Sequence, residues 1–150
     1  MQVPAKPPVG HVVAYEYLWA SQTDEREDGK KVYPCSVVMA DSTAGGQSVA
    51  YLLGISHSPP RPGEAALAVP LQLKLRLGLD RQPAWIYLNQ INVFVWPGPD
   101  LRPGRHVSTR PAAADTCDIG PLPDDWFALL QRELVEAYRQ RRVKLIRRTD

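Results

Sequence analysis

The sequence predicts a mainly β, α+β domain that carries two helices. Its apolar residues fall in short runs rich in valine and aromatic side chains, a composition typical of strands. Fifteen prolines among 150 residues lie mostly between these runs, and proline favours shaped loops over long helices. One apolar stripe at helical spacing lies near the C-terminus. With 44% hydrophobic residues, residues 1–150 are enough for one domain with a core.

The chain opens with an extended lead-in and a first strand. Residues 1–10 contain three prolines, and we expect them to be extended. Residues 11–19 are β-branched and aromatic, which predicts a strand with Tyr15, Tyr17 and Trp19 on one face. This aromatic face is more typical of packing than of a platform for stacked bases. A polar, charged loop follows, with an acidic segment at residues 23–28.

A hairpin over residues 32–60 is the central feature of the sequence. Residues 33–40 form a short apolar run, as in a buried strand, and a glycine-rich turn follows. Residues 48–56 alternate in character, so Val49, Tyr51, Leu53 and Ile55 share one face. The second strand ends in the polar cluster Ser56-His57-Ser58, which two prolines terminate.

Residues 70–77 are ambiguous between a strand and a helix. The leucines alternate from Leu71 to Leu79, which is the period of a strand. However, Leu, Gln, Lys and Arg favour helices, Pro70 suits a first helical turn, and Gly78 suits a C-terminal cap. We interpret the segment as a short helix.

Residues 85–96 form the longest β-like run, which Asn89, Gln90 and Asn92 interrupt. Buried amides need hydrogen-bond partners, so these residues lie either at a bulge or facing an open groove. The pattern favours neither interpretation over the other. Residues 105–108 and 116–119 are candidate short strands.

The C-terminal part predicts a helix near residues 124–141, with an acidic first turn at Asp124. Its apolar stripe packs on the sheet and consists of Trp126, Phe127, Leu130, Leu134 and Tyr138. Residues 143–147 are a candidate edge strand within a basic tail, residues 143–150. A basic run is more often a solvated face than a binding site.

Bulk properties exclude several classes of protein. A net charge of +2 is too small to indicate nucleic-acid binding by itself. Cys35 and Cys117 have no metal-binding spacing, and we expect Cys35 to be a buried free thiol. No stretch reaches the roughly 18 apolar residues of a membrane span, and the N-terminus lacks the core of a signal peptide. We expect a cytoplasmic protein without membrane contact, metal or cofactor.

Several motifs, taken in order, resemble the PemK/MazF-like toxins of bacterial toxin–antitoxin systems. A glycine precedes the first strand, and a charged loop leads into K-x-x-P-C-S-V-V; the third strand closes on I-S-H-S-P-P. The similarity continues through L-G-L-D and W-I-Y-L-N-Q-I-N to the C-terminal helix. It implies a small SH3-like β-barrel with a short helix near 70–77 and a C-terminal helix near 124–141, and a homodimer.

The resemblance also implies a reaction. Active members cleave single-stranded RNA without a metal, by attack of the ribose 2′-OH on the adjacent phosphate to give a cyclic phosphate. This needs a proton acceptor, a proton donor and positive charge. The position of the family hydroxyl is Ser56, whereas the position of its usual arginine is Tyr33, and tyrosine does not carry that charge.

We therefore expect Ser56 and His57 to transfer protons, with Tyr33 beside them, since imidazole titrates near neutral pH. Neutral amides can hydrogen-bond to base edges. The residues expected to bind RNA are Lys30, Lys31, Arg61, Asn89 and Asn92. The expected partners are single-stranded RNA, an antitoxin peptide and a second copy of the chain.

Two other interpretations stay open. Tyr33 and the near-neutral charge favour a catalytically silent RNA- or protein-binding module on the same fold. His57, beside serines and prolines, could also order its loop. A metal or small-molecule enzyme has little support, because His11, His57 and His106 are scattered and no glycine-rich phosphate loop follows a strand.

Overall fold

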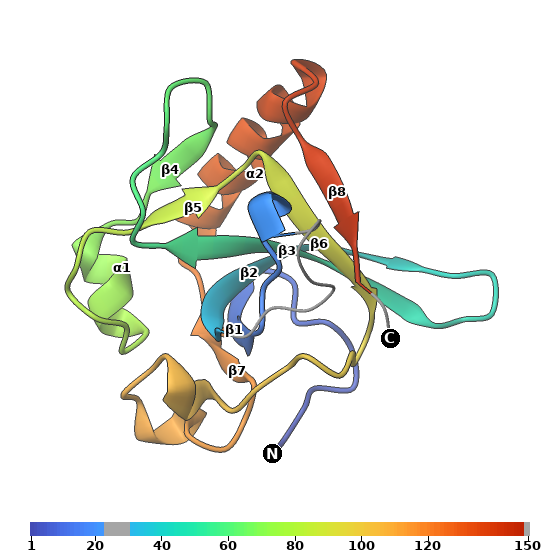
Figure 1. Cartoon of the computed structure of the whole chain (residues 1–150). Coiled ribbons are helices and arrows are strands. Elements are labelled where there is room, and N and C mark those ends of the chain that lie inside the picture. The colour runs from blue at the N-terminus through green and yellow to red at the C-terminus, as the bar shows by residue number, and fades with distance from the viewer. Residues whose placement is uncertain (23–30, 149–150) are drawn as a thin grey trace.

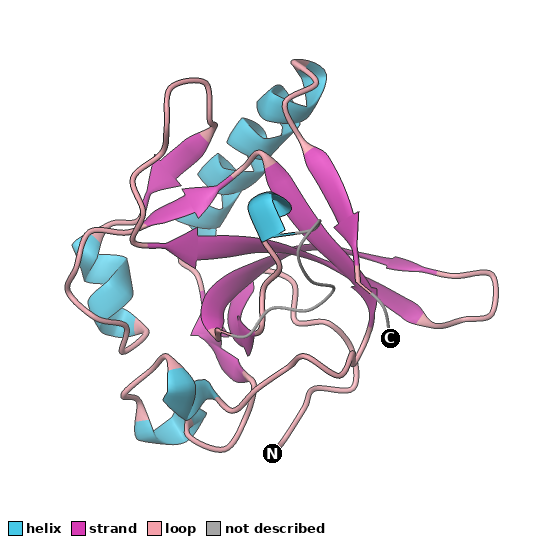
Figure 2. Cartoon of the chain, viewed as in Figure 1, coloured by secondary structure: helices cyan, strands magenta, loops and turns pink. Residues whose placement is uncertain are grey.

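The computed structural model describes residues 1–22 and 31–148, which form eight strands and two α-helices (Figure 1). The strands are β1 (His11–Tyr15), β2 (Tyr33–Ser42), β3 (Ser48–Ser56), β4 (Ala66–Ala68), β5 (Trp85–Tyr87), β6 (Gln90–Val95), β7 (Asp118–Pro121) and β8 (Lys144–Arg147). The α-helices are α1 (Leu71–Arg76) and α2 (Asp124–Arg139), and short 3₁₀ turns lie at Ala20–Gln22, Gly104–His106 and Pro111–Ala113. Figure 2 shows that strands dominate, so the predicted mainly β, α+β class is confirmed.

Strand β3 is the centre of the sheet because it pairs along both edges. Its first edge pairs antiparallel with β2; on its second edge, residues 49–52 pair with β6 and residues 55–56 with β5. The path runs on from β2 to β1 and β7 and from β5 to β4, and β8 lies parallel to β6. Among the described residues the path is open at β4 and β7. The closed barrel implied by the resemblance is thus corrected to an open sheet.

The sheet buries side chains on both of its faces. In β3, Leu53 and Ile55 belong to one hydrophobic core, which also receives Leu130 from α2. Leu52, the residue before Leu53, belongs to a second core together with Tyr15. The two cores follow from the alternation of side chains along a strand, which confirms the pattern predicted for residues 48–56.

The ambiguous segment at 70–77 is a helix. Leu73 and Leu77 are buried, whereas Leu71 and Leu75 are exposed. Side chains four positions apart lie on one helical face, so this burial pattern fits a helix and not the alternation of a strand. Gly78 follows with φ +70°, a conformation that glycine adopts readily.

Helix α2 also matches its prediction, although its stripe is shorter. Leu130 and Ala137 are buried, and Trp126, Phe127 and Leu134 pack against the same core. Tyr138, which was assigned to the stripe, is 68% exposed and is corrected to a surface residue. Because the neighbouring Ala137 is buried, the helix still contacts the core at this point, and Tyr138 lies on its exposed side.

Other segments differ from their predictions in extent or type. Strand β1 ends at Tyr15, and the run 85–96 is divided into β5 and β6 by a break at residues 88–89. Residues 105–108 overlap a 3₁₀ turn and do not form a strand, and β7 begins at Asp118. The three-residue β4 was not predicted, because so short a segment has no measurable period.

Neither α1 nor α2 is long and apolar enough to cross a membrane, and these are the α-helices of the described part of the chain.

Candidate functional site

Two cavities adjoin at the C-terminal end of β3. The first, here named the histidine cavity, encloses about 370 Å³ and includes His57 and His106 in its lining. The second, the aromatic chamber, encloses about 330 Å³ and is lined by rings and amides. Tyr33 and Ser56 line both, so they mark the junction. Sites of roughly 300–1,000 Å³ are typical of small-ligand pockets.

Ser56 is the last residue of β3 and pairs with Trp85 of β5. Its Oγ accepts a hydrogen bond of 3.2 Å from the backbone N–H of Ser58, which turns the chain away from the sheet. The hydroxyl proton is therefore not used by this bond. Ser56 thus presents a donor at the junction, as the sequence predicted for the end of this strand.

His57 is held in a chain of three polar side chains. Its Nε2 lies 2.8 Å from Oδ2 of Asp80, and Oδ1 of Asp80 accepts from Nζ of Lys74 at 2.9 Å. Lys74 comes from α1, is only 3% exposed, and also donates to the carbonyl of Gln82. A buried lysine needs such partners. Because a carboxylate only accepts hydrogen bonds, Nε2 is the ring nitrogen that donates to Asp80, and in a neutral imidazole the lone pair then lies on Nδ1.

The state of Asp80 follows from these contacts. Partial burial acts to raise its pKa, but hydrogen bonds from Lys74, His57 and the backbone of Gln82, with the Lys74 charge, lower the pKa below its usual value. Asp80 is therefore ionised at neutral pH. It orients the imidazole as a carboxylate orients histidine in hydrolytic triads.

Tyr33 begins β2, and the Lys31 side chain lies beside its ring. The Lys31 ammonium lies 5.1 Å from the centroid of the Tyr33 ring, within the range of a cation–π contact. Both residues line the histidine cavity. A positive charge therefore lies beside the position where the resemblance expects an arginine.

Three rings form the wall of the aromatic chamber. The ring of Trp19 contacts Tyr33 and Tyr87 edge to face, with centroid distances of 5.3 and 5.6 Å. Trp19 lies across Gly54, where an added Cβ would be 2.8 Å from its Cη2 atom. The Tyr87 hydroxyl donates to the carbonyl of Ser58. The chamber thus offers flat apolar surface next to Ser56.

A polar edge completes the chamber. Glu64 Oε1 accepts from the backbone N–H of Arg61 at 2.7 Å, and Asn89 Nδ2 lies 3.4 Å from Glu64 Oε2. Arg61 and Asn89, both expected to bind RNA, line this chamber. Burial and the Glu64 charge raise the pKa of Tyr87, with Arg61 opposing, so the phenol stays protonated.

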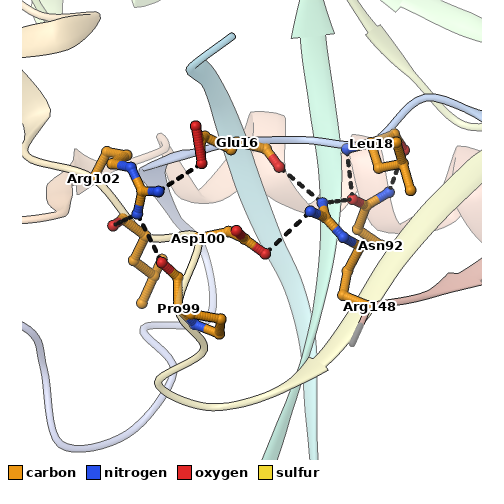
Figure 3. Close-up of polar contacts among 8 residues, drawn as sticks. Glu16, Leu18, Asn92, Pro99, Asp100, Arg102 and Arg148 are labelled. Carbon is orange, nitrogen blue, oxygen red and sulfur yellow. Dashed lines mark hydrogen bonds and ion pairs between the residues drawn. The ribbon is translucent and has the colours of Figure 1, made fainter. Parts of the chain in front are cut away.

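Asn92 has a structural role and not the predicted base contact. Its side chain is fully buried, and its amide bonds both ways with the backbone of Leu18, at 2.9 and 2.8 Å. Arg148 Nη1 donates to the same amide oxygen at 3.0 Å (Figure 3). A buried and fully used amide has no group left for a base, so this prediction is corrected.

The position of Arg148 corrects a second prediction, that of a basic tail at residues 143–150. Its guanidinium donates to the carbonyl of Glu16 and to Asp100 Oδ2, as Figure 3 shows, and the side chain is 1% exposed. The four residues before it form β8, which is paired with β6, so the candidate edge strand at residues 143–147 is confirmed. Residues 144–148 are therefore part of the fold, whereas residues 149–150 are outside the described residues.

The remaining predicted residue, Lys30, lies outside the described residues, as does the acidic segment 23–28. Within the described residues, no group of three His, Cys, Asp or Glu side chains is arranged to hold a metal ion. Sequence reasoning missed Asp80, Lys74, His106, Trp19, Tyr87 and Glu64, because they come from five other segments that only the fold brings to β3.

Comparison of the chain with protein-family models, with curated proteins and with solved structures gives no match.

Proposed function

We propose that the protein is a PemK/MazF-like endoribonuclease that cleaves single-stranded RNA without a metal, through 2′-OH attack and a cyclic phosphate. The observation that carries the proposal is the convergence of Ser56, His57, Tyr33 and Lys31 on one cavity. The sequence predicts proton transfer by Ser56 and His57 and RNA binding by Lys31, and it places Tyr33 at the position of the usual arginine; the role of Ser56 proposed here is charge stabilisation instead. The adjoining aromatic chamber adds the stacking surface by which proteins hold unpaired bases.

The proton transfers follow from the His57–Asp80 contact. Nδ1 of His57 takes the proton of the 2′-OH as the 2′-oxygen bonds to phosphorus, and Asp80 stabilises the imidazolium that forms. The bond between phosphorus and the 5′-oxygen breaks. His106, which lines the same cavity, is the proposed donor of the proton that this oxygen takes up. The Ser56 hydroxyl and the Lys31 ammonium stabilise the charge on the phosphoryl oxygens.

The proposal includes the setting in which this family acts. The partners are an antitoxin peptide that blocks the cavities and a second copy of the chain in a homodimer, and the location is the cytoplasm. Buried, unpaired Cys35 and Cys117 agree with a reducing compartment.

A catalytically silent RNA-binding module is the second candidate. It is favoured by Tyr33 itself, whose ring joins Trp19 and Tyr87 in the chamber wall in the place of an arginine. Rings can hold single-stranded RNA by stacking without any reaction. A silent protein-binding module would use the same surface without RNA.

The test is incubation of the pure protein with a long single-stranded RNA in excess EDTA, with mapping of the new ends. We expect discrete cuts with cyclic phosphate ends, lost in Ser56→Ala and His57→Ala. His11→Ala is the matched control, because His11 also bonds an aspartate, Asp118 at 2.9 Å, but does not line either cavity. Cleavage unchanged in Ser56→Ala and His57→Ala would reject the mechanism, and RNA binding without cuts would select the binding module.

A further inference from the structure

The polar edge of the aromatic chamber has a specific order of hydrogen-bonding groups. Asn89 Nδ2 is a donor, and 3.4 Å away lies Oε2 of Glu64, followed by Oε1 of the same carboxylate. An ionised carboxylate only accepts, and an amide nitrogen only donates. The Asn89 nitrogen and the two Glu64 oxygens therefore follow one another as one donor and two acceptors, while Asn89 Oδ1 accepts from Gln90 Nε2 at 3.4 Å.

This order is complementary to one nucleobase. The Watson–Crick edge of guanine presents the acceptor O6, then the donors N1–H and N2–H. Uracil has one donor between two acceptors, and cytosine has the same order as the protein itself. Adenine has one donor next to an acceptor. Of the four bases, only guanine can satisfy the amide and both carboxylate oxygens together.

The present partners of these groups leave room for a base. Each carboxylate oxygen has a second lone pair beyond the one used by Arg61 N–H or Asn89. The contact between Asn89 and Glu64 is long for a hydrogen bond, and the second hydrogen of the amide is not needed for it. The rings of Trp19, Tyr33 and Tyr87 supply surface for the base plane.

The Glu64 carboxylate has the same sign of charge as the phosphate of any nucleotide, and a base that donates to both of its oxygens would offset that repulsion. The geometry points to the aromatic chamber as a guanine-binding pocket, in which Glu64 determines specificity and Asn89 supports it. Because Ser56 and Tyr33 border the chamber and the histidine cavity, a bound guanosine would present an adjacent phosphate to His57. The last inference rests on the proposed function, but the guanine pocket itself does not.

The test is isothermal titration calorimetry of the full chain with 5′-GMP, IMP, AMP, CMP and UMP. We expect GMP to bind most tightly and IMP, which lacks the N2 amino group, to bind more weakly than GMP. Glu64→Gln keeps an oxygen for Arg61 N–H but replaces the second acceptor by a donor. It should weaken GMP binding about tenfold or more and remove the preference over AMP.

Glu133→Gln is the matched control, since it makes the same change of charge at an exposed position of α2 and should leave GMP binding unchanged. Equal affinity for all five nucleotides, no GMP binding at millimolar concentration, or a GMP preference that persists in Glu64→Gln would overturn the pocket. Cleavage of mixed RNA that His57→Ala abolishes would still stand in those cases. Conversely, a guanine pocket without cleavage would reject the nuclease and keep the pocket.

Discussion

Arg148 Nη2 lies 3.0 Å from Oδ2 of Asp100, and the arginine side chain of this pair is almost completely buried. The same guanidinium bonds the amide of Asn92 and the carbonyl of Glu16. Arg148, which directly follows β8, therefore contacts the loop after β1, strand β6 and the loop after β6. Groups that look like a basic tail and a base-reading amide in the sequence are internal supports of the fold.

Replacement of Arg148 should be costly. Arg148→Met leaves the Asp100 carboxylate buried without its partner, which typically costs about 3–5 kcal/mol of unfolding free energy. Urea denaturation measures the effect. Arg147→Met, at an exposed position of β8, is the control and should change stability by less than about 0.5 kcal/mol. Equal stability of the two variants would contradict the supporting role of Arg148.

Gly54→Ala should disturb the aromatic chamber. Its Cβ would lie 2.8 Å from Trp19 and 3.0 Å from Tyr17, so the rings must shift, at a cost of about 1–3 kcal/mol. Urea denaturation gives the stability. Gly45→Ala is the matched control, since the nearest atom to its Cβ is 3.8 Å away. The steric explanation fails if both alanines are tolerated equally.

Asp80→Asn should change stability in a pH-dependent way. The pKa of Asp80 is lower in the folded protein than in the unfolded chain, so its ionised form stabilises the fold at pH values above the unfolded pKa of about 3.9. This contribution is lost as the pH falls through the folded pKa. The variant should therefore be less stable than the parent at pH 7, and the difference should shrink in acid.

Urea denaturation of both proteins at neutral and at acid pH measures this difference. Glu133→Gln, which neutralises an exposed carboxyl of α2, should track the parent at both pH values. A deficit in Asp80→Asn that is the same at both pH values would show that the carboxylate charge is not responsible.

Tyr33→Arg should raise RNA cleavage. The substitution places a permanent charge and two parallel donors at the junction of the cavities, where negative charge develops on the phosphoryl group. We expect an increase of about tenfold or more in the single-turnover rate. Tyr138→Arg adds the same charge at a position that is 68% exposed on α2, and should leave the rate unchanged. A similar gain in both variants would indicate general attraction of RNA only.

The two thiols should be unreactive in the folded protein. Burial, and then the neighbouring Asp118, raise the pKa of Cys117 to about 11, and burial raises that of Cys35 well above its usual value. Since the thiolate is the reactive form, iodoacetamide at pH 8 should modify neither residue until urea unfolds the chain. Mass spectrometry counts the modified thiols. Rapid labelling of the native protein would show that these sites open.

Local patterns were enough to predict the central hairpin and the C-terminal helix, whereas the helix at residues 70–77 was left ambiguous by its pattern. Ser56 and His57 could be found because they directly follow an alternating strand, and strand ends are common places for polar function. Helix α1 was predicted from its residue types and from the resemblance and is confirmed by its burial, because its alternating leucines by themselves have the period of a strand. Such ambiguity is a property of short apolar segments.

Contacts between distant segments could not be predicted. The residues near His57 in the sequence do not indicate that Asp80 and the buried Lys74 contact or support it. Asn89 and Asn92 are equivalent in the sequence pattern, although Asn89 lines the aromatic chamber and Asn92 is fully buried. The open sheet is a further case, because the pairing of distant strands leaves the described path open at β4 and β7. The periodicity of a short segment carries no information about which distant residues it will contact.

The pairing of β1 with β7 also sets how fast this chain can fold. His11 of β1 contacts Asp118 of β7, 107 residues further along, whereas β2 and β3 form a local hairpin. Contacts of high sequence separation slow folding, and sheets dominated by them fold in roughly milliseconds to seconds. We therefore expect the β2–β3 hairpin to form early and the β1–β7 pairing to form late. Until β7 pairs with it, that edge of β1 has unpaired backbone groups. Before β7 pairs, the partly formed sheet is most prone to aggregation, because the unpaired edge of β1 can pair with another chain. A chaperone that prevents aggregation would bind this intermediate.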